Sequence, residues 1–327
     1  MPQINGQEVG PTGYGLMGLT WRATPPPLEQ AFEAMRAALK NGNNFWNGGE
    51  IYGMPEYNSL VLLEKYFAKY PEDADKVVLS IKGAVSPHGK PDGSPEGVRR
   101  SVDNVLKQLN GRKKLDIFEC ARRDPDVPLG VTFAALQEYI DKGLLGGISL
   151  SEVKASTIHE AVKVAKIVAV EVELSLWSTE VLTNGVAAAC GQYNIPLVAY
   201  SPIGRGILTG AIKKHSDIPA DSALHMYPRF SPQNFDINIQ LVHQIEALAA
   251  KKGCTPAQLA ISWTRCIARR PGMPVIIPIP GATTAARVNE NTQFVDLTDA
   301  ELAEIDATLA KFEVAGKRYP DFIPMDG

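Results

Sequence analysis

Two side chains that could exchange a proton stand near the ends of successive predicted strands. Tyr52 follows the short apolar run 44–47, and Lys82 ends the run 77–82. A lysine ammonium close to a phenol lowers the pKa of that phenol, so this pair could act as an acid near neutral pH. A lysine at the end of an apolar strand also needs a partner, because lysines are rarely buried alone.

The elements that must position this pair alternate regularly along the chain. Short apolar runs cover 16–21, 44–47, 77–82, 115–121, 147–150, 168–174, 197–201 and 275–280. Stretches of helical periodicity between them cover 27–41, 57–69, 95–109, 131–142, 154–166, 185–193, 238–251 and 256–270. Continuously apolar runs are typical of strands buried on both faces of a parallel sheet. Eight strand–helix units predict an α/β fold, the (β/α)8 TIM barrel. A doubly wound open sheet is the alternative, although no GxGxxG follows an early strand.

One interval of this alternation is much longer than the others, the one after the seventh run. Its excess lies in 204–238, which we expect to form a long loop over one mouth of the barrel. Thr255 with Gln258 and Thr298 with Glu301 predict capping boxes at two helix starts. Without an internal repeat or a linker, the pattern predicts a single domain over 1–327.

Composition narrows the class of protein. The chain has 327 residues, of which 45% are hydrophobic and 21% charged, so disordered and collagen-like architectures are excluded. A net charge of -3 offers no basic footprint for nucleic acid and no polybasic membrane patch. Four cysteines without a CxxC pair predict reduced thiols and no metal site. No basic leader with an apolar stretch and no run of membrane-spanning length is present, so we expect a cytoplasmic protein.

Nine short motifs in order along the chain carry a resemblance to a known family. They are GYGLMGLTWR, FWNGGEIYG, VVLSIKGA, LDIFECARRDP, GGISLSEV, EVELSLW, AYSPIGRGILTG, TPAQLAISW and IPIPGATTAARVNEN. With these motifs the chain resembles the aldo-keto reductases over nearly its whole length, and within them the fungal pyridoxal reductase branch. The resemblance implies the (β/α)8 barrel and a reversible, NADPH-dependent reduction of aldehydes or ketones to alcohols.

The resemblance also implies roles for individual residues. Tyr52 matches the proton donor of the family, and Lys82 the partner that lowers its pKa. Ser151 and Glu171 match positions that hold the nicotinamide carboxamide, and Tyr200 matches the aromatic side chain that stacks on the nicotinamide ring. An arginine at 287 favours the phosphorylated cofactor NADP(H), because its planar fork pairs with phosphate oxygens. The full set of implied cofactor-binding residues is Gly15, Leu16, Met17, Ser151, Glu171, Tyr200, Ser201, Pro202, Ile203, Gly204, Arg205, Pro280, Gly281, Thr283, Thr284, Arg287, Glu290 and Asn291.

Two positions depart from the family pattern. Asn47 stands where most members have the aspartate that pairs with the lysine, and Ala121 stands where most have the histidine that orients the carbonyl. Asn47 is a candidate catalytic residue that could touch Lys82, or it could bond only to backbone in its turn. Glu50 is expected to support the turn and could supply the missing negative charge. If Lys82 lacks a paired carboxylate, its field should depress the pKa of Tyr52 further than in relatives that have the pair.

Three functions remain open at this point. The first is an enzyme that reduces an aldehyde with NADPH, with pyridoxal giving pyridoxine as the leading substrate. The second is an NADPH-binding regulatory or redox-sensing barrel with weak turnover, which the altered positions 47 and 121 favour. The third is a reductase of broad specificity for other carbonyl compounds. The expected partner is a small-molecule aldehyde or ketone, bound by a monomer or a weak homo-oligomer.

Overall fold

Eight parallel strands form the centre of the molecule. The computed structural model describes residues 1–323. The strands lie in the order β3 (Tyr14–Gly15), β4 (Phe45–Gly49), β7 (Val78–Gly83), β8 (Leu115–Cys120), β9 (Leu145–Ser151), β10 (Ile167–Glu173), β11 (Leu197–Tyr200) and β12 (Ile276–Pro278). The Gly13 amide donates to the Pro278 carbonyl, and the Gly15 amide to that of Pro280. These bonds join the first strand to the last, which confirms the predicted closed barrel.

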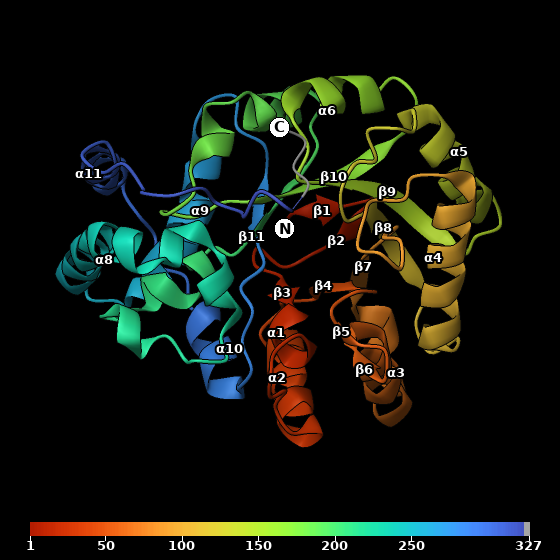
Figure 1. Cartoon of the computed structure of the whole chain (residues 1–327), viewed down its shortest axis with the longest axis horizontal. Helices are drawn as coiled ribbons and strands as arrows, with labels where there is room; N and C mark the ends of the chain where they lie inside the picture. The colour runs from red at the N-terminus through yellow and green to blue at the C-terminus, as the bar shows by residue number, and fades with distance from the viewer. Residues whose placement is uncertain (324–327) are drawn as a thin grey trace.

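Helices surround this barrel, as Figure 1 shows. The helices that follow successive strands are α2 (Leu28–Lys40), α3 (Ser59–Lys69), α4 (Pro95–Leu109), α5 (Leu129–Asp141), α6 (Ala155–Ala161), α7 (Val186–Gln192), α9 (Pro256–Cys266) and α10 (Ala285–Thr292). The shorter or additional helices are α1 (Met17–Thr20), α8 (Pro232–Lys252) and α11 (Asp299–Leu309). Apolar residues of the helices pack with those of the strands in one continuous core; α9 is buried along nearly its whole length.

A hairpin packs against a separate set of inward-facing side chains. Strands β1 (Gln3–Ile4) and β2 (Gln7–Glu8) pair antiparallel, and a second small hairpin, β5 (Gly53–Met54) with β6 (Tyr57–Asn58), follows β4. Ile4 and Val9 join a cluster inside the barrel with residues such as Phe45 and Ile117. The barrel is therefore a packed core rather than a pore.

The helix ends agree with the capping signals in the sequence. Thr255 with Gln258 and Thr298 with Glu301 form the two predicted capping boxes. The α8 helix begins at Pro232, six residues before the expected start, because Ser231 and Pro232 supply an N-cap position and an N1 proline. The predicted long loop after the seventh barrel strand therefore spans 204–231 and contains four short 3-10 turns, η3 (Gly204–Thr209), η4 (His215–Asp217), η5 (Ala223–Met226) and η6 (Pro228–Phe230).

Other predicted elements also differ from the structure in extent or type. The apolar run 16–21 was expected to be a strand, whereas the strand is Tyr14–Gly15 and the run forms α1. Leu16 and Leu19 are both fully buried, three residues apart on one side of a helical turn, so a short apolar run fits either structure. The helix expected over 154–166 ends at Ala161, because the chain from Val162 leads into β10.

Candidate active site

A buried lysine lies at the centre of the candidate site. Lys82 is next to last in β7, and only 4% of it is exposed. Its Nζ donates to Glu119 Oε1 on β8 at 2.9 Å, to Glu171 Oε1 on β10, and to Asn47 Oδ1 on β4 at 3.3 Å. The lysine therefore has two carboxylate partners, neither of which is the expected Glu50.

Asn47 completes this cluster from the opposite side. Its Nδ2 donates to Glu119 Oε1 at 3.1 Å and to Glu171 Oε2 at 2.6 Å. Asn47 thus touches Lys82, which was one of the two possibilities that the sequence left open. We call the group of Asn47, Lys82, Glu119 and Glu171 the lysine cluster; all four are buried.

Burial and charge act in opposite directions on the ionisable groups of the lysine cluster. Burial by itself lowers the pKa of Lys82, but the charges of Glu119 and Glu171 outweigh it, so the net pKa lies above the ordinary lysine value. Burial raises the pKa of Glu171 well above its ordinary value, the charge of Glu119 raises it further, and Lys82 opposes both. The ammonium is held charged at neutral pH, while burial and the charge of Glu119 both oppose ionisation of Glu171.

Tyr52 lies in the turn that follows β4. Its carbonyl accepts from Thr20 Oγ1 at 2.6 Å and from the Ser59 amide at 3.1 Å. Its ring lies against Gly49, where an added Cβ would stand 2.9 Å from ring atoms, so a side chain at 49 would displace the phenol. The Trp21 ring lies beside it, with 5.5 Å between ring centroids. The backbone of this turn therefore fixes the ring at the carboxyl ends of the strands.

The expected depression of the Tyr52 pKa is wrong for this structure. Burial raises the pKa of Tyr52 to about 12; the charge of Lys82 lowers it, and those of Glu171 and Glu119 raise it. Lys82 does not lack a carboxylate, so its field is compensated rather than free. Tyr52 consequently holds its proton across the neutral range.

Glu50 takes the supporting part that the sequence favoured. Its two oxygens accept from Ser101 Oγ and, at 2.6 Å, from Asn104 Nδ2, both on α4. It ties the turn after β4 to that helix, apart from the lysine cluster.

The residues expected to bind a nucleotide lie along one arc of the barrel mouth. Ser151 ends β9, and its buried Oγ has no hydrogen-bond partner among the described residues. After β11, Ser201, Gly204, Arg205 and Gly206 all have positive φ, which turns the chain sharply at the start of the long loop. Pro202 is buried and Ile203 packs on the core within this turn.

The rest of this set lies where the first and last strands meet. Gly15 bridges Gly281, and the Thr284 side chain caps α10 by accepting from the Arg287 amide. Of the remaining members, Leu16 and Asn291 are buried, and Met17 and Arg287 are exposed. Glu290 lies 3.9 Å from the Arg287 guanidinium. Pro280 and Thr283 lie on either side of Gly281 in the sequence. Leu16 has its side chain in the core, so that side chain is not available to a ligand.

The donor set fits a nicotinamide nucleotide. An orphaned buried hydroxyl at Ser151 can bond to a carboxamide. The turn at 201–206 and the capped start of α10 offer backbone amides to phosphate groups. Both oxygens of Glu171 accept hydrogen bonds inside the lysine cluster, and its expected contact with a carboxamide stays a prediction.

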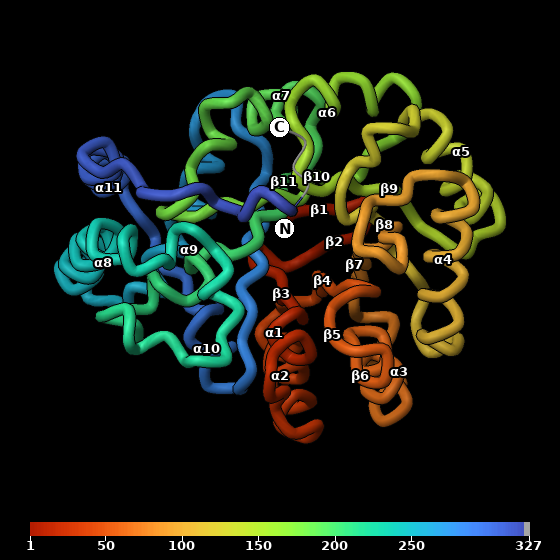
Figure 2. The backbone as a smooth tube through the Cα atoms, viewed as in Figure 1, coloured from red at the N-terminus to blue at the C-terminus, as the bar shows by residue number. Residues whose placement is uncertain are grey.

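The chain after α11, residues 310–323, crosses the barrel mouth, and the sequence did not predict this; we call it the C-terminal segment. Figure 2 shows this end of the chain running from α11 back toward the centre of the barrel. Arg318 Nη2 donates to Glu152 Oε2 at 2.5 Å, and Nη1 donates to Glu173 Oε2 at 3.2 Å. The Tyr319 hydroxyl lies 2.6 Å from that of Tyr200, the residue expected to stack on nicotinamide.

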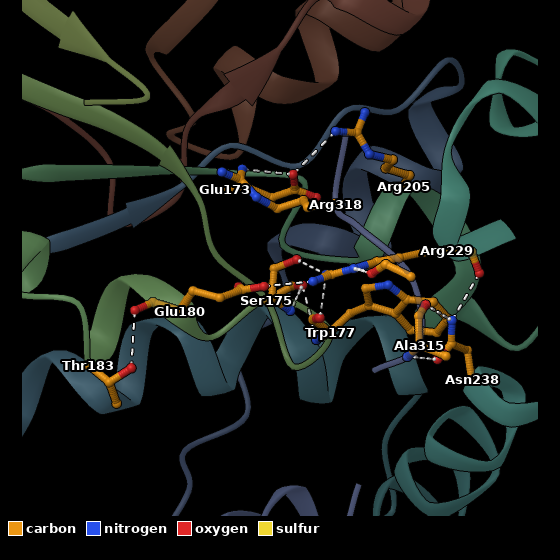
Figure 3. A network of polar contacts seen from close by, with 12 residues as sticks. Glu173, Ser175, Trp177, Glu180, Thr183, Arg205, Arg229, Asn238, Ala315 and Arg318 are labelled. Carbon is orange, nitrogen blue, oxygen red and sulfur yellow. Dashed lines mark hydrogen bonds and ion pairs between the residues drawn. The ribbon is translucent and has the colours of Figure 1, made fainter. Parts of the chain in front are cut away.

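A second arginine joins this segment to the long loop. Arg205 Nη2 also donates to Glu173 Oε2 at 3.2 Å, so one buried carboxylate binds two guanidinium groups, as Figure 3 shows. Arg229 Nε donates to the Gly316 carbonyl at 3.3 Å, and Asn238 binds both the amide and the carbonyl of Ala315. The sequence signal for these partners was two acidic residues at strand ends, Glu152 directly after β9 and Glu173 as the last residue of β10.

Two further properties of residues 1–323 limit the chemistry. They contain no cluster of three or more histidine, cysteine or acidic side chains placed to hold a metal ion. No helix within the described part of the chain has the length and apolarity needed to cross a membrane.

Comparisons with known proteins assign the family. The model of the aldo/keto reductase family matches residues 11–310. "Probable pyridoxal reductase 2" of Schizosaccharomyces pombe is 43% identical over 331 residues, with 98% of this chain and 97% of that protein covered. A relative from Saccharomyces cerevisiae, named provisionally as a pyridoxal reductase, is 39% identical and covers 94% of this chain and 95% of its own.

A solved structure agrees on the fold. The glycerol dehydrogenase of Gluconobacter oxydans superposes with a TM-score of 0.82 over 98% of both chains, at 20% identity. Taken with the buried lysine and the tyrosine beside it, these matches show that the chain belongs to the aldo/keto reductase family and is an oxidoreductase acting on carbonyl or CH–OH groups.

Proposed function

We propose that the protein reduces an aldehyde to the alcohol with NADPH, and that pyridoxal, giving pyridoxine, is its substrate. The observation that carries the proposal is a phenol that keeps its proton, Tyr52, under the influence of a buried ammonium, Lys82, at the carboxyl end of the barrel. A reduced nicotinamide, when bound, supplies the hydride for the carbonyl carbon. Tyr52 then donates its hydroxyl proton to the carbonyl oxygen, and Lys82 stabilises the phenolate that remains.

The cofactor would be held by residues on the arc described above. The Ser151 hydroxyl is the donor and acceptor available to a carboxamide, and the turn at 201–206 offers amides to the pyrophosphate. Arg287 is half-exposed at the start of α10, where its fork can bind a 2'-phosphate bidentately. These positions support NADP(H) over NAD(H).

Two observations support pyridoxal within the class of aldehydes. The names of the fungal relatives refer to this substrate, and they match over nearly the whole chain. Trp21 is half-exposed beside Tyr52, so a flat heteroaromatic aldehyde could stack on the indole with its carbonyl near the phenol. The Ala121 side chain offers no hydrogen bond to a carbonyl, and such stacking would orient the substrate in its place.

The test measures NADPH oxidation with pyridoxal by the parent and by Tyr52→Phe. Loss of the proton donor should lower kcat by about 10² to 10⁴, the usual contribution of a positioned general acid. Affinity for NADPH should stay unchanged. Tyr57→Phe is the matched control, because the Tyr57 hydroxyl is buried, has no hydrogen-bond partner among residues 1–323, and lies in the neighbouring hairpin.

The outcomes separate the three functions. Turnover of pyridoxal that Tyr52→Phe abolishes supports the proposal. Faster turnover of simple aromatic aldehydes or quinones than of pyridoxal would indicate a reductase of broad specificity. Tight NADPH binding with equal, very slow turnover by parent and variant would contradict the proposal and indicate a regulatory barrel.

A further inference from the structure

The lysine cluster holds more negative groups than positive ones. Glu119 and Glu171 both contact the Lys82 ammonium, and their side chains are 0% and 3% exposed. The titratable groups of the cluster are Lys82 from β7, Glu119 from β8 and Glu171 from β10. Tyr52, from the turn after β4, is the titratable group outside the cluster that interacts with all three. One ammonium can compensate one buried carboxylate, whereas a second ionised carboxylate would be left uncompensated in a medium of low dielectric constant.

Asn47, the neutral residue of the lysine cluster, makes hydrogen bonds that only an amide can make. The Asn47 amide group donates to a carboxylate oxygen on each glutamate, and its carbonyl accepts from the ammonium. A carboxylate in place of this amide would lie 2.6 Å and 3.1 Å from two acceptor oxygens with no hydrogen between them. The cluster therefore requires an amide at 47 so long as both glutamates are present.

Asn47 and Glu171 occupy similar positions around Lys82, so an amide and a carboxylate could be exchanged between them. Their contact joins an amide on β4 to a carboxylate on β10, and each side chain also accepts from Lys82. Exchanging the two groups, with a carboxylate at 47 and an amide at 171, preserves the number of carboxylates, the hydrogen bond between β4 and β10 and both bonds from the lysine. The 3.1 Å contact from position 47 to Glu119 Oε1 then joins two carboxylates and needs a proton shared between them. Changing either position alone alters the number of carboxylates.

We propose that Glu119 and Glu171 are positioning residues that together form the counter-ion of Lys82 and retain one proton between them, so that Asn47 and Glu171 tolerate exchange of their groups but not single replacement of Asn47 by a carboxylate. They act through Lys82 on the acidity of Tyr52 and touch no reacting atom. For its activity readout the proposal rests on the reductase function proposed above. Its stability readout is independent of that function.

The experiment compares the parent with Asn47→Asp, Glu171→Gln and the double exchange Asn47→Asp/Glu171→Gln. Asn47→Asp brings a third carboxylate to one ammonium, so we expect kcat with pyridoxal to fall by at least about 100-fold at unchanged NADPH affinity. The double exchange should return to within about 10-fold of the parent, and Glu171→Gln should lower kcat less than Asn47→Asp. Thermal midpoints should follow the same order, with Asn47→Asp the least stable.

A matched control has the same net charge as the double exchange. Asn47→Asp/Glu50→Gln also removes one carboxylate, but from the pair with Ser101 and Asn104 outside the lysine cluster. It should remain as impaired as Asn47→Asp, while Glu50→Gln alone should retain the activity of the parent.

Specific rescue by Glu171→Gln, and not by Glu50→Gln, supports the proposal. Full activity and stability of Asn47→Asp, or a double exchange no better than Asn47→Asp, would overturn it. If Asn47→Asp does not fold, recovery of a folded double exchange is the same rescue, and failure of both is the overturning result. If the parent reduces no aldehyde, the proposed function fails, and the thermal midpoints alone decide this inference.

Discussion

Replacing Arg318 by methionine tests whether the C-terminal segment is held over the barrel mouth by buried charge. Methionine keeps an apolar stem of similar length and removes the guanidinium. In the parent this group binds Glu152 at 2.5 Å and Glu173 at 3.2 Å, and both carboxylate side chains are 3% exposed. The variant therefore leaves two buried carboxylates with fewer partners.

The remaining contacts set the size of the effect. Removing one partner of a buried ion pair costs about 3–5 kcal/mol. Here Glu173 keeps Arg205 at 3.2 Å, Glu152 keeps the Glu173 amide at 2.8 Å, and the Arg318 side chain is itself 21% exposed. We therefore expect the free energy of unfolding to fall by about 2–3 kcal/mol at neutral pH, somewhat less than for a fully isolated charge.

The effect of Arg318→Met on the free energy of unfolding should depend on pH, through the ionisation of Glu152. Burial raises the pKa of Glu152, but bonds to Arg318 outweigh burial, with help from Arg122, and the net pKa lies below its ordinary value. In the parent this carboxylate adds stability above the unfolded pKa of about 4.3, and that stability is lost as pH falls through the lower folded value. In Arg318→Met, loss of this guanidinium raises the Glu152 pKa relative to the parent, so less stability is gained when this carboxylate ionises. The difference between parent and variant should therefore grow with pH.

Urea unfolding at about pH 4 and about pH 7 measures this difference directly. Lys317→Met is the matched control, because Lys317 is exposed and its ion-pair partner within residues 1–323 is the exposed Asp321. It should change the free energy of unfolding by less than about 0.5 kcal/mol at either pH. A loss in Arg318→Met that is the same at both pH values would refute the argument from buried charge and leave only lost packing.

Three further results are expected. NADPH should bind at least about tenfold tighter than NADH, a difference of about 1.4 kcal/mol, and Arg287→Ala should erase most of it; equal affinities of the parent in fluorescence titration would contradict this. Hydrogen exchange in 204–231 should slow when NADP is added, and unchanged protection would assign that loop another purpose. Lys252 and the Thr298 backbone lower the pKa of Glu301 to about 2, so the stability that this carboxylate adds above its unfolded pKa of about 4.3 is lost as pH falls toward 2. Glu301→Gln should remove that pH-dependent increment, measured as the change in unfolding free energy on acidification.

The sequence was sufficient for the barrel because its strands are nearly continuous apolar runs. Seven of the eight runs coincide with strands, displaced by one or two residues at their ends. The exception, 16–21, shows the limit: Leu16 and Leu19 are buried from one helical turn as well as they would be from a strand. The early start of α8 is a similar case, since proline at 232 was assigned to the loop and is an N1 residue.

The need for a partner at Lys82 was predictable, but the partners were not. Asn47 was considered because most aldo-keto reductases have an aspartate there, and Glu50 because it lies close to Asn47 and Tyr52 in the sequence. The carboxylates come from Glu119 and Glu171, which lie 37 and 89 residues further along the chain. A closed barrel brings inward-facing residues of separate strands into one layer, so the pairing depends on strand order and tilt rather than on distance in sequence.

The C-terminal segment has no helical or strand periodicity, so the sequence does not predict its path. Its path is set by side chains on other elements. Asn238 on α8 binds the amide and carbonyl of Ala315 as a neighbouring strand would, and Arg229 binds the next carbonyl. These contacts bring Arg318 to Glu173, whose Oε2 also accepts from Arg205 at the start of the long loop. Since one carboxylate oxygen binds both guanidinium groups, displacing either changes the electrostatic environment of the other. The C-terminal segment and the turn at 201–206 are thus energetically linked through Glu173, which belongs to neither of them.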